Sequence, residues 1–332
     1  MEYRLLGNTG LLVSAIGLGT NNFGARLDYK SSEKILHSSL DLGINMVDTA
    51  DVYSSGISEE FIGKAIKSKR DQYIIATKVG IRWEKGINDE GLSSTNIKRS
   101  VEGSLKRLNS EYIDLYQTHI YDPYTPIEET LKALDDLVTQ GKVRHIGCSN
   151  LMSWEMVEAI HISQRFGWKK FSTIQPEYSM LVRHVENELI HACKKYSIGI
   201  LPYFPLASGF LTGKYQRDKP LPSGARLTEN SRPELTDRFL TENNYNIIEN
   251  LTIWAKERNK NLLDLAFAWL LANKCVSSVI SGATNVDQLK ANASTSTWKL
   301  SKEEIEEINK ILPSSDKRNI GLAGRRKLRS ER

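Results

Sequence analysis

The chain has 332 residues, a formal net charge of +5 at pH 7, 40% hydrophobic residues and 26% charged residues. This composition is typical of a folded globular protein and excludes a chain that is disordered throughout. No apolar run reaches the roughly 18 residues that a membrane-spanning helix requires, so we expect no membrane association. The polar start Met1–Arg4 does not resemble a signal peptide, and three cysteines without a CxxC pair favour a reducing compartment. We therefore expect a cytoplasmic protein.

The positive charge is concentrated at the C-terminus. Residues 317–332 contain seven Lys or Arg residues and one Glu, so the rest of the chain is nearly neutral. We expect residues 314–332 to form a basic, flexible, solvated tail. A basic terminus is also compatible with a polyanionic partner. Because the chain has no zinc-finger spacing, stacking-aromatic motif or basic helical face, we expect no nucleic-acid partner.

The first predicted element is a β-hairpin, in which residues 2–5 and 11–13 flank the turn Gly7-Asn8-Thr9-Gly10. Strands and helices then alternate along the chain. The apolar pattern predicts strands at 15–18, 46–47, 73–78, 112–119, 143–148, 171–175, 199–202 and 276–280. Helices are predicted at 31–42, 58–66, 94–108, 126–140, 153–166, 185–196, 243–258, 262–271, 286–293 and 301–312. A polar connection at 206–241 lacks periodicity and is typical of a lid or binding segment.

Eight strands that alternate with helices, without a break in composition, predict one closed (β/α)8 TIM barrel, of the α/β class. The alternative is an open, doubly wound sheet that binds a dinucleotide. Its fingerprint in the first βα turn is incomplete, because residues 17–22 contain Gly17 and Gly19 but no third glycine. The barrel is therefore favoured.

Three neighbouring strands end on chemically reactive side chains. Asp48 follows the apolar pair Met46-Val47, Lys78 ends the strand at 73–78, and His119 ends the strand at 112–119. Tyr53 lies on the loop after Asp48, before a predicted helix with Ser58 at its N-cap. In a barrel the C-terminal strand ends form one mouth, so these four side chains are expected to meet there.

These residue types suit the reduction of a carbonyl group. A nicotinamide supplies the hydride, because no side chain does so, and a tuned acid supplies the proton. A tyrosine is too weak an acid unless a neighbouring cation stabilises its phenolate. Lys78 is the candidate cation, Asp48 would hold it against Tyr53, and His119 would orient the carbonyl oxygen.

Each of the four residues also has an ordinary structural interpretation: a loop anchor, a packing tyrosine, a surface charge or a buried imidazole. Together they favour a catalytic site, because Asp and Lys are rarely tolerated near a core unless they are paired. A metal-dependent hydrolase would need more ligands than His119 with Asp48, Asp122, Glu177 and His184. No HxH or HExxH pair is present, so we expect no metal.

Asp48, Tyr53, Lys78 and His119 match, in order and context, the catalytic tetrad of the aldo-keto reductases, and the chain resembles that family over roughly residues 1–312. Further matching stretches are 147–150, 175–178, 203–215 and 281–292. The resemblance implies an NADP-dependent reductase of aldehydes or ketones, built as one barrel domain over residues 1–313. It also implies that the hairpin plugs the barrel bottom and that extra helices and long loops lie at the C-terminal face.

The resemblance further implies a binding site for NADP(H). Ser149, Asn150 and Gln175 would hold the nicotinamide carboxamide, and Tyr203 would stack on the ring. A loop at 203–215 would hold the pyrophosphate. The full set of expected cofactor contacts is Gly19, Thr20, Asn21, Asp48, Ser149, Asn150, Gln175, Tyr203, Phe204, Pro205, Leu206, Ser208, Gly209, Lys214, Arg226, Gly282, Thr284, Gln288 and Asn292.

Two departures from the family concern specificity. Many relatives carry a basic residue after the position of Thr284, where it grips the 2′-phosphate, but this chain has Asn285. We expect NADPH nevertheless, with Lys290 as the compensating cation. Many relatives have Trp-Pro after the histidine, where this chain has Ile120-Tyr121. We expect the substrate to contact a set of aromatic and catalytic residues, namely Tyr53, His119, Phe23, Trp83 and Tyr121.

A second function is a cofactor-sensing regulatory subunit resembling the β-subunits of potassium channels, which share this barrel. Those relatives carry Asn at the position of His119, and the histidine here favours an enzyme. The expected partner is therefore a small-molecule carbonyl compound. The sequence is also compatible with an oligomer.

Overall fold

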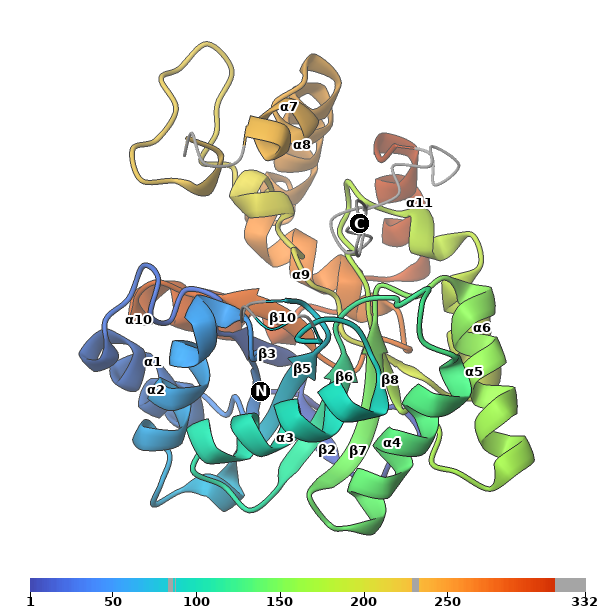
Figure 1. Cartoon of the computed structure of the whole chain (residues 1–332). Helices are drawn as coiled ribbons and strands as arrows, with labels where there is room; N and C mark the ends of the chain where they lie inside the picture. The colour runs from blue at the N-terminus through green and yellow to red at the C-terminus, as the bar shows by residue number, and fades with distance from the viewer. Residues whose placement is uncertain (83–85, 87, 229–232, 314–332) are drawn as a thin grey trace.

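The computed structural model describes residues 1–82, 86, 88–228 and 233–313. Its centre is a sheet of eight parallel strands surrounded by helices (Figure 1). The order of the strands in the sheet is β10-β3-β4-β5-β6-β7-β8-β9. Their bounds are β3 (Ile16–Gly19), β4 (Met46–Asp48), β5 (Ile74–Val79), β6 (Ile113–Thr118), β7 (Val143–Ser149), β8 (Thr173–Gln175), β9 (Gly199–Ile200) and β10 (Val279–Gly282).

The two ends of the strand order meet, which closes the sheet into a barrel. Ile200 in β9 donates to the Cys275 carbonyl over 2.7 Å and accepts from the Ser277 amide over 2.9 Å. The Ile280 amide in β10 donates to the Pro202 carbonyl over 3.0 Å. The predicted (β/α)8 barrel is confirmed, although the last strand begins at Val279 rather than at residue 276.

The predicted hairpin is formed by β1 (Tyr3–Leu5) and β2 (Leu12–Ser14), and it closes the bottom of the barrel. Leu6 and Val13 pack against inward-facing residues of the strands, including Met46 and Leu115, in a small interior core. Arg4 fixes the hairpin by donating to the carbonyls of Val276 and Leu271 over 2.9 and 2.8 Å. The barrel is therefore filled from below, which leaves only its upper end open for chemistry.

Helices cover the outside of the barrel, and the larger core lies between them and the strands. The helices that follow strands are α1 (Tyr29–Asp41), α2 (Ile57–Ala65), α3 (Ser94–Arg107), α4 (Ile127–Thr139), α5 (Ser153–Phe166), α6 (Leu189–Tyr196), α9 (Leu262–Ala272) and α10 (Val286–Ser294). α1 begins two residues before the predicted start, because Asp28 is the N-cap and accepts from the Ser31 amide over 2.9 Å.

Additional helices lie beyond the strand ends: α7 (Pro233–Phe239), α8 (Glu242–Lys256) and α11 (Lys302–Ile311), with α7 and α8 grouped at the top of Figure 1. The sequence did not predict α7, because a helix of about two turns buries only Leu235 and Phe239, too few positions to show a period. Arg238 of α7 pairs with the buried Glu177 at 2.9 Å, which fixes the long connection to the barrel mouth.

No helix in the described part of the chain is long and apolar enough to cross a membrane. The predicted basic tail at 314–332 lies outside the described residues.

Candidate active site

Lys78 is the central charge of the site. Its ammonium donates to Asp48 Oδ2 over 2.7 Å, to the Thr49 carbonyl over 2.7 Å and to the Tyr53 hydroxyl over 3.4 Å. The side chains of Lys78 and Asp48 are 0% and 3% exposed. Both project into the barrel from adjacent strands, at positions where parallel pairing places neighbouring strand ends together. A buried carboxylate thus holds a buried ammonium beside a phenol.

Tyr53 stands at the start of a strained turn. Ser54, Ser55 and Gly56 have φ angles of 51°, 53° and 89°, so three successive residues are left-handed. Such a conformation costs roughly 1–2 kcal/mol for each residue that is not glycine. It persists only where the surrounding structure determines it. One contact that holds the turn is the Ser54 hydroxyl, which donates to the Phe23 carbonyl over 2.8 Å.

This turn corrects the prediction for Ser58. The N-cap of α2 is Gly56, two residues earlier, because the left-handed turn already brings the chain into the helix there. Ser58 is buried inside the first turn, where its hydroxyl donates to the Thr20 carbonyl over 3.1 Å. Ser58 therefore fastens the helix to the β3 loop instead of capping it.

His119 completes the group. Its amide donates to the Val79 carbonyl over 2.8 Å, which continues the pairing of β5 and β6 by one residue. The imidazole faces the Tyr53 ring edge to face, with ring centroids 6.0 Å apart and an interplanar angle of 77°. Asp48, Tyr53, Lys78 and His119 thus lie together, with Tyr53 in contact with both the ammonium and the imidazole ring.

The environment shifts the pKa of both central groups. Burial acts to lower the pKa of Lys78, but Asp48 and Tyr53 together raise it above its usual value, so the ammonium persists at neutral pH. Burial raises the pKa of the Tyr53 phenol above 10, and the nearby Lys78 opposes that rise. Lys78 thus acts in the expected direction, but burial outweighs it, and the phenol holds its proton.

Asp48 has further hydrogen-bond partners that the sequence pattern at the strand ends does not predict. Its Oδ1 accepts from the Gln175 amide over 2.7 Å and from the Gln117 amide over 3.4 Å. Gln117 is fully buried in β6, on the same inward face as Leu115. The sequence analysis missed Gln117, although an amide on the inward face of an apolar strand was the available signal.

The residues expected to hold a nicotinamide form one hydrogen-bonded chain. The Ser149 hydroxyl donates to the Gln175 carbonyl over 2.7 Å, and the Asn150 amide donates to Ser149 Oγ and to the His119 carbonyl, each over 2.9 Å. The Tyr203 hydroxyl donates to Asn150 Oδ1 over 2.9 Å. Asn150 has both amide hydrogens engaged, so its remaining capacity is an acceptor on Oδ1. The structure therefore brings these four residues to the same edge of the barrel as the tetrad.

A turn after β9 presents features of an anion site. Phe204, Ala207, Ser208 and Gly209 all have positive φ angles, and Pro205 and Leu206 lie between them. The Ser208 hydroxyl is buried and has no hydrogen-bond partner among the described residues. A Cβ on Gly209 would come within 3.1 Å of the Lys214 ammonium, so the lysine lies directly over that glycine.

Two arginines stand near Lys214. The pKa of Lys214 is lowered by burial and then by the like charges of Arg26 and Arg226. Arg226 Nη2 donates to Asn22 Oδ1 over 3.4 Å. This hydrogen bond joins the long segment 206–241 to the loop after β3. The two arginines that help to lower the pKa of Lys214 concentrate positive charge there, which favours a bound anion. Arg26 was not among the expected contacts, and one arginine in a polar loop gives no sequence signal.

The expected adenosine-side residues lie at the start of α10. The Gln288 side chain accepts from the Thr284 amide and hydroxyl over 2.9 and 3.0 Å, and Asn292 donates to the Gly282 carbonyl over 3.4 Å. Asn285 is the N-cap of α10 and accepts from the Gln288 amide over 2.9 Å. Asn285, which replaces the basic residue of many relatives, thus has a structural role as the cap of this helix.

The three expected residues at the β3 end differ in position. Thr20 is fully buried, and its hydroxyl donates to the Asp48 carbonyl over 2.9 Å, so it positions the strand end. Gly19 packs against Ile280, while the amides of Asn21 and Asn22 lie beside Gly282. Gly19 and Asn21 therefore border the start of α10.

The expected substrate residues are only partly assembled. Phe23 is 0% exposed and belongs to the main core, so in this conformation no substrate can contact its side chain. Tyr121 is half-buried, two residues after His119. Trp83 lies outside the described residues. In the described part of the chain, no group of three or more His, Cys, Asp or Glu side chains is arranged to hold a metal ion.

Comparison with known proteins identifies the family. Residues 15–313 match the sequence model of the Aldo/keto reductase family. A protein of Oryza sativa subsp. japonica named probable voltage-gated potassium channel subunit beta is 34% identical, over 96% of this chain and 98% of its own. Aldo-keto reductase YhdN of Bacillus subtilis is 35% identical, over 97% and 96%. L-glyceraldehyde 3-phosphate reductase of Escherichia coli O157:H7 is 34% identical, over 95% and 94%.

Relatives at this identity extend along nearly the whole barrel, and the mouth of that barrel gathers a phenol, an ammonium, a carboxylate and an imidazole. The chain belongs to the aldo/keto reductase family.

Proposed function

We propose that the protein reduces an aldehyde or ketone to an alcohol with NADPH as cofactor, and that the reaction is reversible. The observation that carries this proposal is the Lys78 ammonium, which lies 2.7 Å from the Asp48 carboxylate and 3.4 Å from the Tyr53 hydroxyl. A phenol beside a buried ammonium is an acid whose conjugate base has a counter-charge already in place. The family relationship supports an oxidoreductase in general.

In this proposal Tyr53 donates its proton to the carbonyl oxygen of the substrate. The raised pKa of Tyr53 keeps the phenol protonated, and Lys78 stabilises the phenolate that remains. Asp48 holds Lys78 in place, and His119, whose ring lies edge to face with that of Tyr53, orients the carbonyl. The bound nicotinamide supplies the hydride that the protein cannot.

The cofactor would span three groups of residues. The chain formed by Ser149, Asn150, Gln175 and Tyr203 offers hydroxyl and amide groups to a carboxamide. The buried hydroxyl of Ser208, which has no hydrogen-bond partner among the described residues, and the positive charges of Lys214, Arg26 and Arg226 suit a diphosphate. The start of α10 suits the adenosine side, with Lys290 as the proposed partner of a 2′-phosphate.

The direct test is oxidation of NADPH, followed by its absorbance, with a panel of aldehydes and ketones. Wild type should oxidise NADPH when a reactive carbonyl is added, and Tyr53→Phe should lower kcat by about a hundredfold or more. NADPH binding, measured by quenching of protein fluorescence, should survive in Tyr53→Phe. Full activity of Tyr53→Phe would show that another group donates the proton.

A second candidate is a cofactor-sensing regulatory subunit, which the similarity to the Oryza sativa protein suggests. The complete tetrad, with His119 facing Tyr53, favours the enzyme instead. Tight NADPH binding without turnover of any carbonyl tested, together with a stable complex with a channel protein, would favour the second candidate.

A further inference from the structure

The strained turn after Tyr53 is covered by a side chain from a distant helix. A Cβ on Gly56 would come within 2.8 Å of Arg107 Cδ and 3.0 Å of its Nε. Arg107 at the end of α3 therefore lies directly on the Gly56 backbone. The Ser54 hydroxyl holds the turn from the Phe23 side, so Arg107 is a second and independent restraint.

Arg107 is itself held in place. Its Nε donates to Glu59 Oε2 over 2.7 Å, and Glu59 is fully buried in α2. The other carboxylate oxygen of Glu59 accepts from the Thr77 hydroxyl over 2.5 Å. Thr77 is the residue before Lys78 in β5, and its side chain points out of the barrel where that of Lys78 points in. One chain of contacts thus runs from the turn that carries Tyr53 to the strand that carries Lys78.

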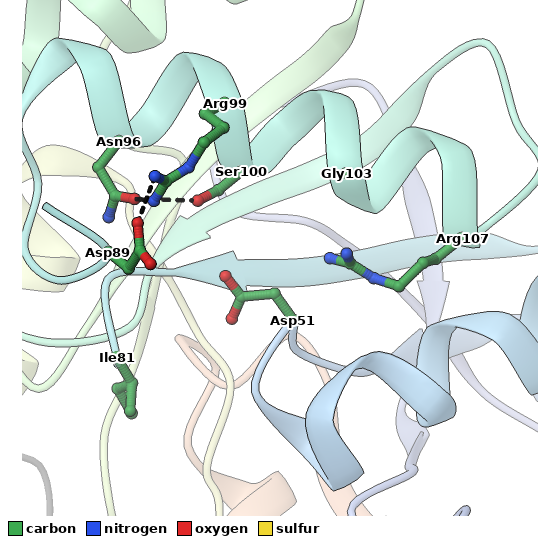
Figure 2. A pocket seen from close by; sticks show the side chains of 8 residues that line it. All are labelled: Asp51, Ile81, Asp89, Asn96, Arg99, Ser100, Gly103 and Arg107. Atoms are coloured by element: carbon green, nitrogen blue, oxygen red, sulfur yellow. Dashed lines mark hydrogen bonds and ion pairs between the residues drawn. The ribbon is translucent and has the colours of Figure 1, made fainter. Parts of the chain in front are cut away.

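Arg107 also lines a pocket, which Figure 2 shows from close by. Asp51, from the loop after β4, lines the same pocket, and the Arg107 guanidinium points towards it in this view. Asp51 is 2% exposed and stands two residues before Tyr53. Its amide donates to the Lys78 carbonyl over 3.4 Å. Asp51 thus joins the segment before Tyr53 to β5, beside the pocket that Arg107 also lines.

We propose that Arg107 is a positioning residue for Tyr53. It holds the left-handed turn Ser54–Gly56 against α2 and thereby fixes the phenol beside Lys78, without touching the substrate or cofactor itself. This inference rests on the proposed function, in which Tyr53 is the proton donor. The conformation of the turn is strained, so removing a restraint allows it to relax and carry Tyr53 away from the ammonium.

The main variant is the double substitution Arg107→Met with Glu59→Gln. Methionine keeps an apolar stem over Gly56, and glutamine still accepts from Thr77 without leaving an unpaired buried carboxylate, so the fold should be retained. Arg107→Lys is the conservative variant, because lysine keeps the charge but lacks the Nε donor that reaches Glu59. The matched control is Arg99→Met. Arg99 lines the same pocket from the same helix but pairs with Asp89, whereas Arg107 pairs with Glu59 and lies against Gly56.

The expected result is a fall in kcat of about tenfold to a hundredfold in the double variant, because a small displacement of a catalytic group has that effect. The Kd for NADPH should not change. The limb of the pH–rate profile on which the phenol loses its proton should move to higher pH, since Tyr53 would lie farther from Lys78. Arg107→Lys should recover part of kcat, and Arg99→Met should match wild type.

A second readout does not depend on turnover. In protein labelled with ¹³Cζ-tyrosine, the Tyr53 signal is assigned by its absence from Tyr53→Phe, and its pKa is read from the chemical shift. The pKa should rise in the double variant and stay unchanged in Arg99→Met. If the double variant folds and both its kcat and the pKa of Tyr53 are unchanged, the proposal is wrong. The proposal is also wrong if kcat falls only in proportion to a loss of thermal stability while the pH–rate profile does not move. If wild type turned over no carbonyl, the proposed function would fail, while the pKa of Tyr53 would still decide whether Arg107 positions the phenol.

Discussion

Gln175 donates its side-chain amide to Asp48 Oδ1 over 2.7 Å, although the two residues are 127 positions apart in the chain. Asp48 therefore receives Lys78 on one oxygen and Gln175 on the other. The main-chain carbonyl of the same Gln175 accepts from Ser149 Oγ. Asp48, which holds the proposed acid in place through Lys78, is thus hydrogen-bonded to a residue proposed to hold the nicotinamide. A substitution at the catalytic group should therefore also affect cofactor binding, and a substitution at the cofactor residues should affect catalysis.

Asp48→Asn should destabilise the protein and lower activity. Removing one partner of a buried ion pair leaves Lys78 as an uncompensated charge, which costs about 3–5 kcal/mol of unfolding free energy. The measurement is urea denaturation at pH 7, together with kcat. The double variant Asp48→Asn with Lys78→Met removes both charges and should be more stable than Asp48→Asn alone. If the double variant were the less stable of the two, the penalty would not arise from an unpaired ammonium.

Lys214→Met should weaken cofactor binding. If the diphosphate binds among Lys214, Arg26 and Arg226, loss of one charged partner should raise the Kd for NADPH by about tenfold or more. The Kd of wild type should also rise with ionic strength more steeply than that of the variant, because salt screens the charge that was removed. Lys219→Met, an exposed lysine of the same connection, is the control and should bind like wild type. Equal Kd values for the two variants would place the diphosphate elsewhere.

Asn285→Arg should strengthen the preference for NADPH over NADH. The side chain stands at the N-cap of α10, where an arginine would meet a 2′-phosphate with a charge-assisted hydrogen bond. Loss of the cap should cost about 1 kcal/mol of stability. Asn285→Asp is the matched control, because aspartate caps equally well but repels the phosphate, so it should lower the preference. The measurement is the ratio of kcat/KM with NADPH to kcat/KM with NADH, for wild type and both variants. A ratio that moved in the same direction in both variants would rule out this placement of the 2′-phosphate.

Acid should destabilise the protein through His184. Burial and the neighbouring Arg238 lower the pKa of His184 below its usual 6.5, so the folded state favours the neutral ring. The stability that this group contributes is present above pH 6.5 and is lost as the pH falls, because the unfolded chain then binds the proton more tightly. The free energy of unfolding of His184→Gln should decline less than that of wild type over this range. Identical slopes in His184→Gln and wild type would contradict the assignment.

The sequence alone determined the barrel and the tetrad. The pattern of apolar residues predicts the strands and their order. Because the C-terminal ends of barrel strands share one mouth, Asp48, Lys78 and His119 are predicted to lie together there. Local signals were sufficient there because a regular strand fixes where its last side chain points. The cofactor residues at the start of α10 and beside β7 and β8 were expected from the resemblance to the family.

Only the tertiary structure decided the rest. Gly56, rather than Ser58, is the N-cap of α2, because the left-handed turn depends on contacts from Phe23 and Arg107 that local propensity does not contain. Arg107 reaches that turn from a helix end 51 positions after Gly56, and Gln117 and Gln175 meet Asp48 across the barrel. α7 buries too few residues to show a period. Each of these features depends on distances between segments that are remote in the chain, and those distances exist only once the barrel has closed.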